Sequence, residues 1–119
     1  MNTIKTIERI DPGERFCRAV VHGDTIYLAG VTASVAGDAR AQTRDALAKI
    51  DHYLEKLGTD KSHLLVVQIW LKDIERDFAG MNAAWSEWIP ADAKPARATC
   101  EAKLANPGLL VEIIATAAR

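Results

Sequence analysis

The spacing of apolar and polar residues near the start of the chain predicts three strands before any helix. Residues 3–10 alternate loosely between apolar and polar side chains and predict a first strand, which the turn sequence DPGE follows. Residues 17–21 and 25–30 are apolar runs joined by a His-Gly-Asp link. Two such runs around a short glycine-containing link predict a β-hairpin.

Two later segments change to the helical period. Residues 38–57 carry apolar side chains at steps of three and four, with Asp38 as N-cap and Gly58 just after the end. Residues 73–89 form a second predicted helix, which Pro90 ends. The predicted buried stripes are Leu47, Ile50, Leu54 and Leu57 on the first helix, and Phe78, Met81, Trp85 and Ile89 on the second.

Three more strands complete the prediction. Residues 63–72 are apolar on both faces, and residues 96–104 and 109–117 are predicted to pair as a hairpin around the loop sequence ANPG. The order β-β-β-α-β-α-β-β over residues 1–119 predicts an α+β fold in a single domain. In this fold one mixed sheet carries both helices on one face.

The face of the sheet away from the helices is predicted to be apolar as well. Its expected members are Leu64, Val66, Trp70, Leu110 and Ile114. Soluble monomers rarely expose a contiguous apolar patch of this kind. We therefore expect another copy of the chain to cover it, which predicts a homo-oligomer.

Glu112 stands out because it interrupts the apolar run LLVEIIATA, where an unpaired charge is costly. In the predicted last hairpin Glu112 lies opposite Glu101, on the face that carries Arg97 and Thr99. Cys100 then faces the helices as a small core residue. One interpretation is structural: Arg97 and Glu112 form an ion pair, or each lies at a solvated edge. The other is a site for a small anion, in which the arginine binds a carboxylate and Glu112 holds a water. The spacing leaves both open.

Composition narrows the function classes. The chain has 15 basic and 16 acidic residues and a net charge of −1, so a nucleic-acid partner is not favoured. No apolar segment is long enough to span a membrane, and the charged start does not resemble a signal peptide. Two cysteines cannot form a disulfide framework, so we expect a cytoplasmic protein. The three histidines lack metal-ligand spacing, and neither a metal nor another cofactor is expected.

Several motifs resemble the RidA (YjgF/YER057c) family nearly from end to end. They are IYLAG, AQTRDALAKIDHYLEKLGTDKSHL, VVQIWLKD, MNAAW and, above all, PARATCEAKL followed by VEIIATAA. The resemblance implies a fold similar to that of trimeric chorismate mutase. It also implies a homotrimer whose sheets line a central barrel, with three sites in the clefts between subunits.

The resemblance also implies a reaction. Active members of the family hydrolyse 2-imino acids and their enamine tautomers to 2-oxo acids and ammonia. Arg97 matches the arginine that holds the substrate carboxylate, and Glu112 matches the glutamate that positions the attacking water. An iminium carbon is already electrophilic, so positioning and general base catalysis suffice.

Further site residues follow from the same resemblance, with some departures. Thr99, Gly30 and Asn82 match family positions around the substrate, although a structural role for Asn82 is also open. Phe16 stands where the deaminase branch usually has tyrosine. Ala29 and Val31 replace a frequent serine and glutamine. The resemblance therefore predicts an imine deaminase with an altered substrate range. The alternative is a non-enzymatic sensor or interaction protein that binds small carboxylates.

Overall fold

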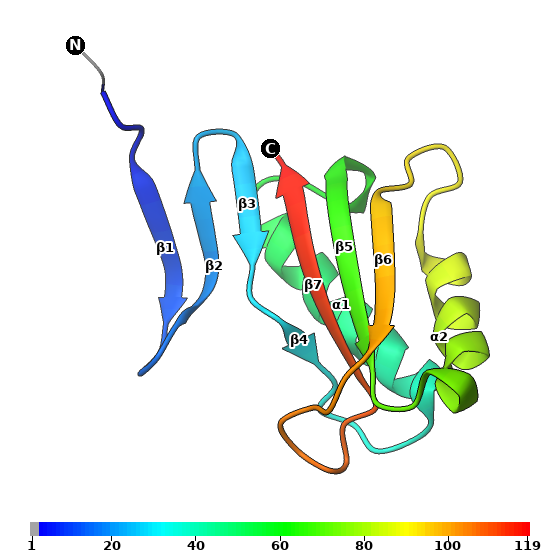
Figure 1. The fold of residues 1–119 in the computed structure, drawn as a ribbon. Helices are drawn as coiled ribbons and strands as arrows, with labels where there is room; N and C mark the ends of the chain where they lie inside the picture. Colours follow the sequence, from blue (N-terminus) through cyan, green and yellow to red (C-terminus); the bar gives the residue numbers. More distant parts are fainter. Residues whose placement is uncertain (1–2) are drawn as a thin grey trace.

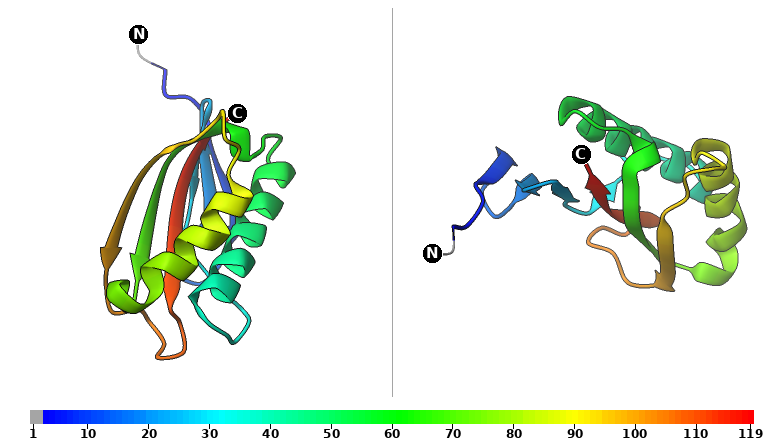
Figure 2. Two further views of the ribbon diagram at one scale, coloured as in Figure 1. Left: turned by 90° about the vertical axis from the view of Figure 1, so that its right-hand side faces the viewer. Right: turned by 90° about the horizontal axis from the view of Figure 1, so that it is seen from above.

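Two helices cover one face of a seven-stranded mixed sheet in the computed structural model, which describes residues 3–119 (Figures 1 and 2). The strand order is β1-β2-β3-β7-β5-β6, and the short β4 also pairs with β7. The strands are β1 (Ile7–Pro12), β2 (Cys17–His22), β3 (Thr25–Leu28), β4 (Val31–Thr32), β5 (Leu64–Leu71), β6 (Ala96–Glu101) and β7 (Val111–Ala118). The helices are α1 (Ala39–Lys56) and α2 (Ile74–Trp88), with a 3₁₀ turn at Lys61–His63. This arrangement confirms the predicted fold class.

The β1–β2–β3 meander forms one wing of the sheet. The predicted hairpin is confirmed as β2 and β3, with Gly23 at φ 61° in the link between them. The first strand begins later than predicted, because pairing with β2 aligns Ile7 with His22 and Pro12 with Cys17. Viewed from above, β1 and β2 extend beyond the helical layer (Figure 2). The inner side chains of the wing are nevertheless buried, among them Val21 and Ile26, and Asp11 of β1 contacts Tyr53 and Lys56 of α1.

The first helix begins at its predicted cap, Asp38, and the second begins one residue after its predicted start. Asp38 accepts a hydrogen bond from the Ala41 amide, and Asp73 accepts one from Arg76. The buried face of α2 differs from the prediction, because Phe78 is 42% exposed. The buried residues are instead Asp77, Met81, Ala84 and Trp85, a stripe rotated by about one residue. Neither described helix has the length and apolar content that a membrane crossing requires.

The predicted hairpin between the last two strands is wrong. β6 pairs with β5 in parallel, β7 pairs with β5 antiparallel, and β5 therefore lies between them. The reason is that α2 is a crossover connection, which returns the chain to the same end of the sheet and makes β5 and β6 parallel neighbours. The segment 102–110 then passes the end of β5, where the Lys72 amide donates to Leu110 O at 3.0 Å.

β5 is the central strand of the helix-covered half. Its inward side chains Val67, Ile69 and Leu71 are buried, as predicted. Leu64 and Leu65 are reversed relative to the prediction, because a register shift between Leu64 and Val66 buries Leu64 and exposes Leu65. From Val66 onward the strand alternates regularly, and its register therefore fixes the faces of β6 and β7.

Candidate functional site

Arg97 and Glu112 lie on opposite faces of the sheet. Arg97 pairs with Val67 of β5, whereas Glu112 pairs with Trp70, three residues further along the same strand. Paired residues point to the same side and successive residues alternate, so an odd separation places the two side chains on opposite faces. They are also about 10 Å apart along the strand direction. The prediction that Glu112 faces Glu101 and shares a face with Arg97 is wrong.

Arg97 points to the helix-covered side at the exposed edge of the sheet. Its guanidinium donates toward Met81 Sδ at 3.9 Å and lies 5.2 Å from the centre of the Trp85 ring. Burial lowers the pKa of the Arg97 guanidinium from its ordinary value. Within residues 3–119 no carboxylate lies within 4.0 Å of it. The Arg97 guanidinium is therefore a partly desolvated cation that packs against Trp85 and Met81 and has no counter-ion within residues 3–119.

Thr99 and Asn82 belong to the same side of the molecule as Arg97. Thr99 follows two residues later on β6, and its Oγ1 is buried without a hydrogen-bond partner in the described part of the chain. Asn82 is half-buried on α2 and follows Met81, which contacts Arg97. Cys100 points the other way and is exposed, so the predicted core position of this thiol is wrong.

Glu112 lies on the open face and is held against Gly30. A Cβ atom added to Gly30 would come within 2.1 Å of Glu112 Oε2 and 3.0 Å of its Cδ. Gly30 lies between β3 and β4, and β4 pairs with β7 at Thr32 and Glu112. Glycine at this position therefore leaves the space that the Glu112 carboxylate occupies, and a side chain there would displace the carboxylate.

Phe16 lies near this group on the turn between β1 and β2, where 59% of it is exposed. Arg18, which the sequence analysis did not single out, stacks over its ring at 5.7 Å and donates to Gly30 O at 3.4 Å. The alternation of β2 carries a signal for Arg18, since Ala19 and Val21 point to the core and Arg18 therefore points to the open face. The chain thus presents two groups: Arg97 and Thr99 beside α2 on one face, and Glu112, Gly30, Phe16 and Arg18 on the other.

Comparison with known proteins agrees with this architecture. The family model described as Endoribonuclease L-PSP matches residues 6–119. The chain belongs to this family, which includes the YjgF and RidA proteins.

Family relatives cover almost the whole chain. The RutC family protein YoaB of Escherichia coli K12 is 45% identical over 113 residues, which span 95% of this chain and 98% of YoaB. A YjgF-family crystal structure from Neisseria meningitidis superposes with a TM-score of 0.95 at 38% identity, covering 98% of each chain. A protein from Salmonella typhimurium, described as a putative translation initiation inhibitor, has a TM-score of 0.87 at 40% identity and covers 96% of this chain and 98% of that one. The two solved structures share the fold of this chain, and of the three descriptions only that of the Salmonella protein names an activity.

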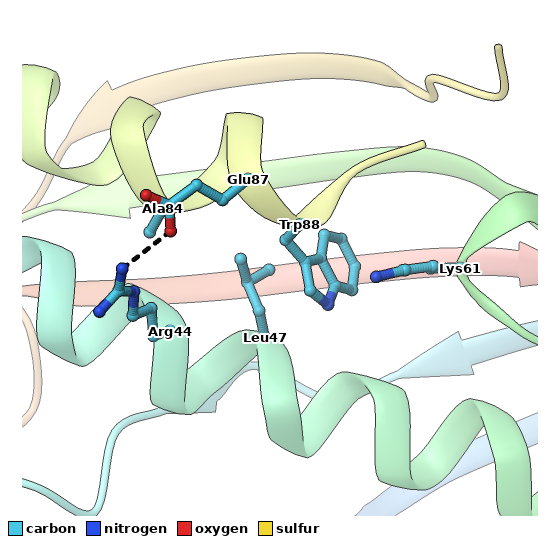
Figure 3. Close-up of a pocket in the computed structure, with 6 residues that line it drawn as sticks. All are labelled: Arg44, Leu47, Lys61, Ala84, Glu87 and Trp88. Carbon is cyan, nitrogen blue, oxygen red and sulfur yellow. Dashed lines mark hydrogen bonds and ion pairs between the residues drawn. The ribbon is translucent and has the colours of Figure 1, made fainter. Parts of the chain in front are cut away.

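This chain also has a pocket between α1 and α2, on the helical layer (Figure 3). Its volume is about 240 Å³. The charged side chains that line it already have partners. Arg44 forms an ion pair with Glu87 at 2.8 Å, and the Lys61 ammonium lies 5.1 Å from the centre of the Trp88 ring. The lining residues are Arg44, Leu47, Lys61, Ala84, Glu87 and Trp88, and the predicted site residues are not among them. No cluster of three or more His, Cys, Asp or Glu side chains suited to a metal occurs in residues 3–119.

Proposed function

We propose that this protein hydrolyses reactive 2-imino acids and their enamine tautomers to 2-oxo acids and ammonia, without a cofactor and in the cytoplasm. The observation that carries the proposal is the state of Arg97. A guanidinium packed on Trp85 and Met81, with its pKa lowered by burial and no carboxylate within reach in residues 3–119, is prepared to receive an anion. A planar carboxylate matches its two-pronged geometry.

Glu112 supplies the second function, the positioning of water. Its carboxylate accepts a proton from a water whose oxygen attacks C2 of the imine. The new C2–O bond gives a carbinolamine, and Glu112 passes the proton it has taken on to the nitrogen. The C2–N bond then breaks, the nitrogen leaves as ammonia, and the hydroxyl loses its proton to solvent as C2 becomes the carbonyl of the 2-oxo acid. General base assistance of this kind contributes about 10²-fold or more.

Because the two groups lie on opposite faces of one chain, a site that uses both requires two copies. β6, which carries Arg97, is the last strand of the sheet and has one neighbour, β5. The open face around Glu112 carries exposed apolar side chains that include Val66 and Tyr27. We infer a homotrimer in which the β6 edge of one copy meets the open face of the next. Three equivalent sites then form, each with Arg97 from one chain and Glu112 from its neighbour.

The first test is to generate an imino acid in situ with an amino-acid oxidase and to measure ammonia and 2-oxo acid formation. We expect Arg97→Ala to abolish the acceleration and to weaken 2-oxo acid binding by about 2–4 kcal/mol, with little rescue by Arg97→Lys. Glu112→Gln is expected to keep binding and melting temperature while lowering turnover by about 10²-fold. Near-native turnover in Arg97→Ala would remove this residue from the mechanism.

A mixing experiment tests the shared site directly. Arg97→Ala and Glu112→Gln chains, each inactive alone, are co-expressed with different tags and purified as mixed trimers. Every trimer that contains both kinds of chain has both intact groups at one of its three sites, so about a third of the wild-type activity returns. If one chain supplied both residues, every site would contain a defect and no activity would return.

The same feature of Arg97 supports a second candidate function, a sensor that binds small carboxylates without turnover. Calorimetry with a 2-oxo acid on the same preparation separates the two. Arg97-dependent binding without any ammonia release would favour the sensor.

A further inference from the structure

Arg18 is the second partly buried arginine that lacks an acidic partner in the described part of the chain. Five of the eight arginines lie within 4.0 Å of a carboxylate there, and the other three are Arg9, Arg18 and Arg97. Arg9 is exposed on β1, where water solvates it, whereas Arg18 and Arg97 are both half-buried. A partly desolvated guanidinium without a carboxylate is a candidate anion-binding group.

Arg18 and Glu112 meet at the same residue. The Arg18 guanidinium donates to the Gly30 carbonyl at 3.4 Å, while the Glu112 carboxylate packs against the Cα of Gly30. Both side chains are on the open face, and yet they form no ion pair within 4.0 Å in residues 3–119. The Arg18 cation therefore lies beside the Glu112 carboxylate, to which we assign the positioning of the attacking water.

The Arg18 guanidinium keeps most of its hydrogen-bonding capacity. It lies over the exposed ring of Phe16 at 5.7 Å, and the one hydrogen bond that it makes within residues 3–119 is the long contact to Gly30 O. A guanidinium has five N–H donors, so an edge remains for a bidentate carboxylate. The cation–π contact with Phe16 holds the guanidinium on this side of the sheet.

We propose that Arg18 selects substrates with a second carboxylate, namely 2-imino dicarboxylic acids. This inference rests on the proposed function. Arg97 of one copy holds the carboxylate next to the imine carbon, Glu112 of the next copy holds the water, and Arg18 beside Glu112 holds the carboxylate at the far end of the side chain. A short apolar imino acid would leave Arg18 without a partner, which is unfavourable for a partly buried cation.

The experiment compares two imines made in situ, one from glutamate by a glutamate oxidase and one from 2-aminobutyrate by an amino-acid oxidase. We expect the wild-type protein to show a kcat/KM at least about 10-fold higher for the dicarboxylic imine, which one charge-assisted pair can supply. In Arg18→Gln the ratio of the two kcat/KM values should fall to about one. Arg9→Gln removes an equal charge from an exposed position and should leave the ratio unchanged.

Binding of the stable products supplies a second measurement. Calorimetry with 2-oxoglutarate and 2-oxobutyrate should show the same preference and the same dependence on Arg18. Equal kcat/KM values in the wild type would overturn this inference and leave the deaminase proposal intact. An Arg18→Gln variant whose kcat/KM falls equally for both substrates and which melts at a lower temperature would also overturn it, because Arg18 would then have a structural role. Arg18-dependent preference in binding, with no hydrolysis of any imine, would support the recognition and overturn the proposed reaction.

Discussion

Gly30→Ala is a one-atom perturbation of the Glu112 position. The added Cβ would lie 2.1 Å from Glu112 Oε2, and an ordinary contact starts at 3.4 Å, so the carboxylate oxygen must move by at least 3.4 − 2.1 = 1.3 Å. The nearest atoms are the end of a flexible side chain, and Gly30 is not among the glycines with positive φ. The backbone can therefore accept alanine while the carboxylate is displaced.

The expected result is a loss of activity without a comparable loss of stability. A misplacement of about 1 Å in a catalytic group can reduce turnover by about 10²-fold. Replacing glycine by alanine reduces the conformational entropy of the unfolded chain and stabilises by about 0.4–1 kcal/mol, which offsets the repacking of one side chain. We therefore expect kcat to fall by about 10²-fold, with a free energy of unfolding within about 1 kcal/mol of the wild type.

The assay measures imine hydrolysis, melting temperature and 2-oxo acid affinity on one preparation. Gly108→Ala is the matched control, because a Cβ at Gly108 would meet no atom within 4 Å and its activity should be unchanged. Wild-type turnover in Gly30→Ala would refute the reasoning, since it would show that the reaction tolerates a displaced Glu112. Unfolding of Gly30→Ala would refute the claim that only the side chain moves.

Two further predictions concern the surroundings of the site and the wing of the sheet. Met81 is fully buried and contacts Arg97, so Met81→Ala should cost about 2–5 kcal/mol in thermal unfolding and raise KM more than it lowers kcat. Hydrogen bonds from Lys56 and then Tyr53 hold the pKa of the Asp11 carboxyl below its ordinary value of 3.8. Because the folded-state pKa is lowered, this contact contributes stability above pH 3.8 that is lost as the pH falls through the folded-state value. Titration by nuclear magnetic resonance should show the Asp11 pKa rising toward 3.8 in Lys56→Ala, and an unmoved pKa would contradict the assignment.

Local signals in the sequence were sufficient for most elements of the fold. Asp38 caps the first helix as predicted, the second helix lies within one residue of its predicted range, and the link at Gly23 closes the predicted hairpin. These features depend on a few neighbouring residues, which explains why they could be predicted. The exposure of Phe78 and Leu65 could not be predicted, because a small rotation of α2 and a bulge in β5 depend on tertiary packing.

The pairing of the last strands is where the local interpretation failed. The sequence ANPG resembles a hairpin turn, but the strands end at Glu101 and begin again at Val111, which leaves a longer connection than hairpins usually have. The signal for the correct topology was the order strand, helix, strand over β5, α2 and β6, which predicts a parallel crossover pair. Placing β5 between β6 and β7 moves Arg97 and Glu112 to opposite faces. The candidate residues could thus be named from the sequence, while their arrangement required the register of β5.

The separation of Arg97 and Glu112 makes assembly a condition for activity, and Val66→Asp tests this condition. Val66 is 40% exposed on the open face, so aspartate there should cost the single chain only about 1 kcal/mol. In the proposed trimer the carboxylate would be buried without a partner, and the native mass should fall from about 3 × 13.0 = 39 kDa to that of one chain.

Each half of the site is built within one chain, since Arg97 packs on Trp85 and Glu112 on Gly30. Both halves should therefore persist in the Val66→Asp monomer while turnover is lost. Val35→Asp, at a residue 45% exposed in the loop before α1, is the control that should stay trimeric and active. A monomeric Val66→Asp protein with wild-type turnover would show that one chain carries a complete site, and the shared site would have to be abandoned.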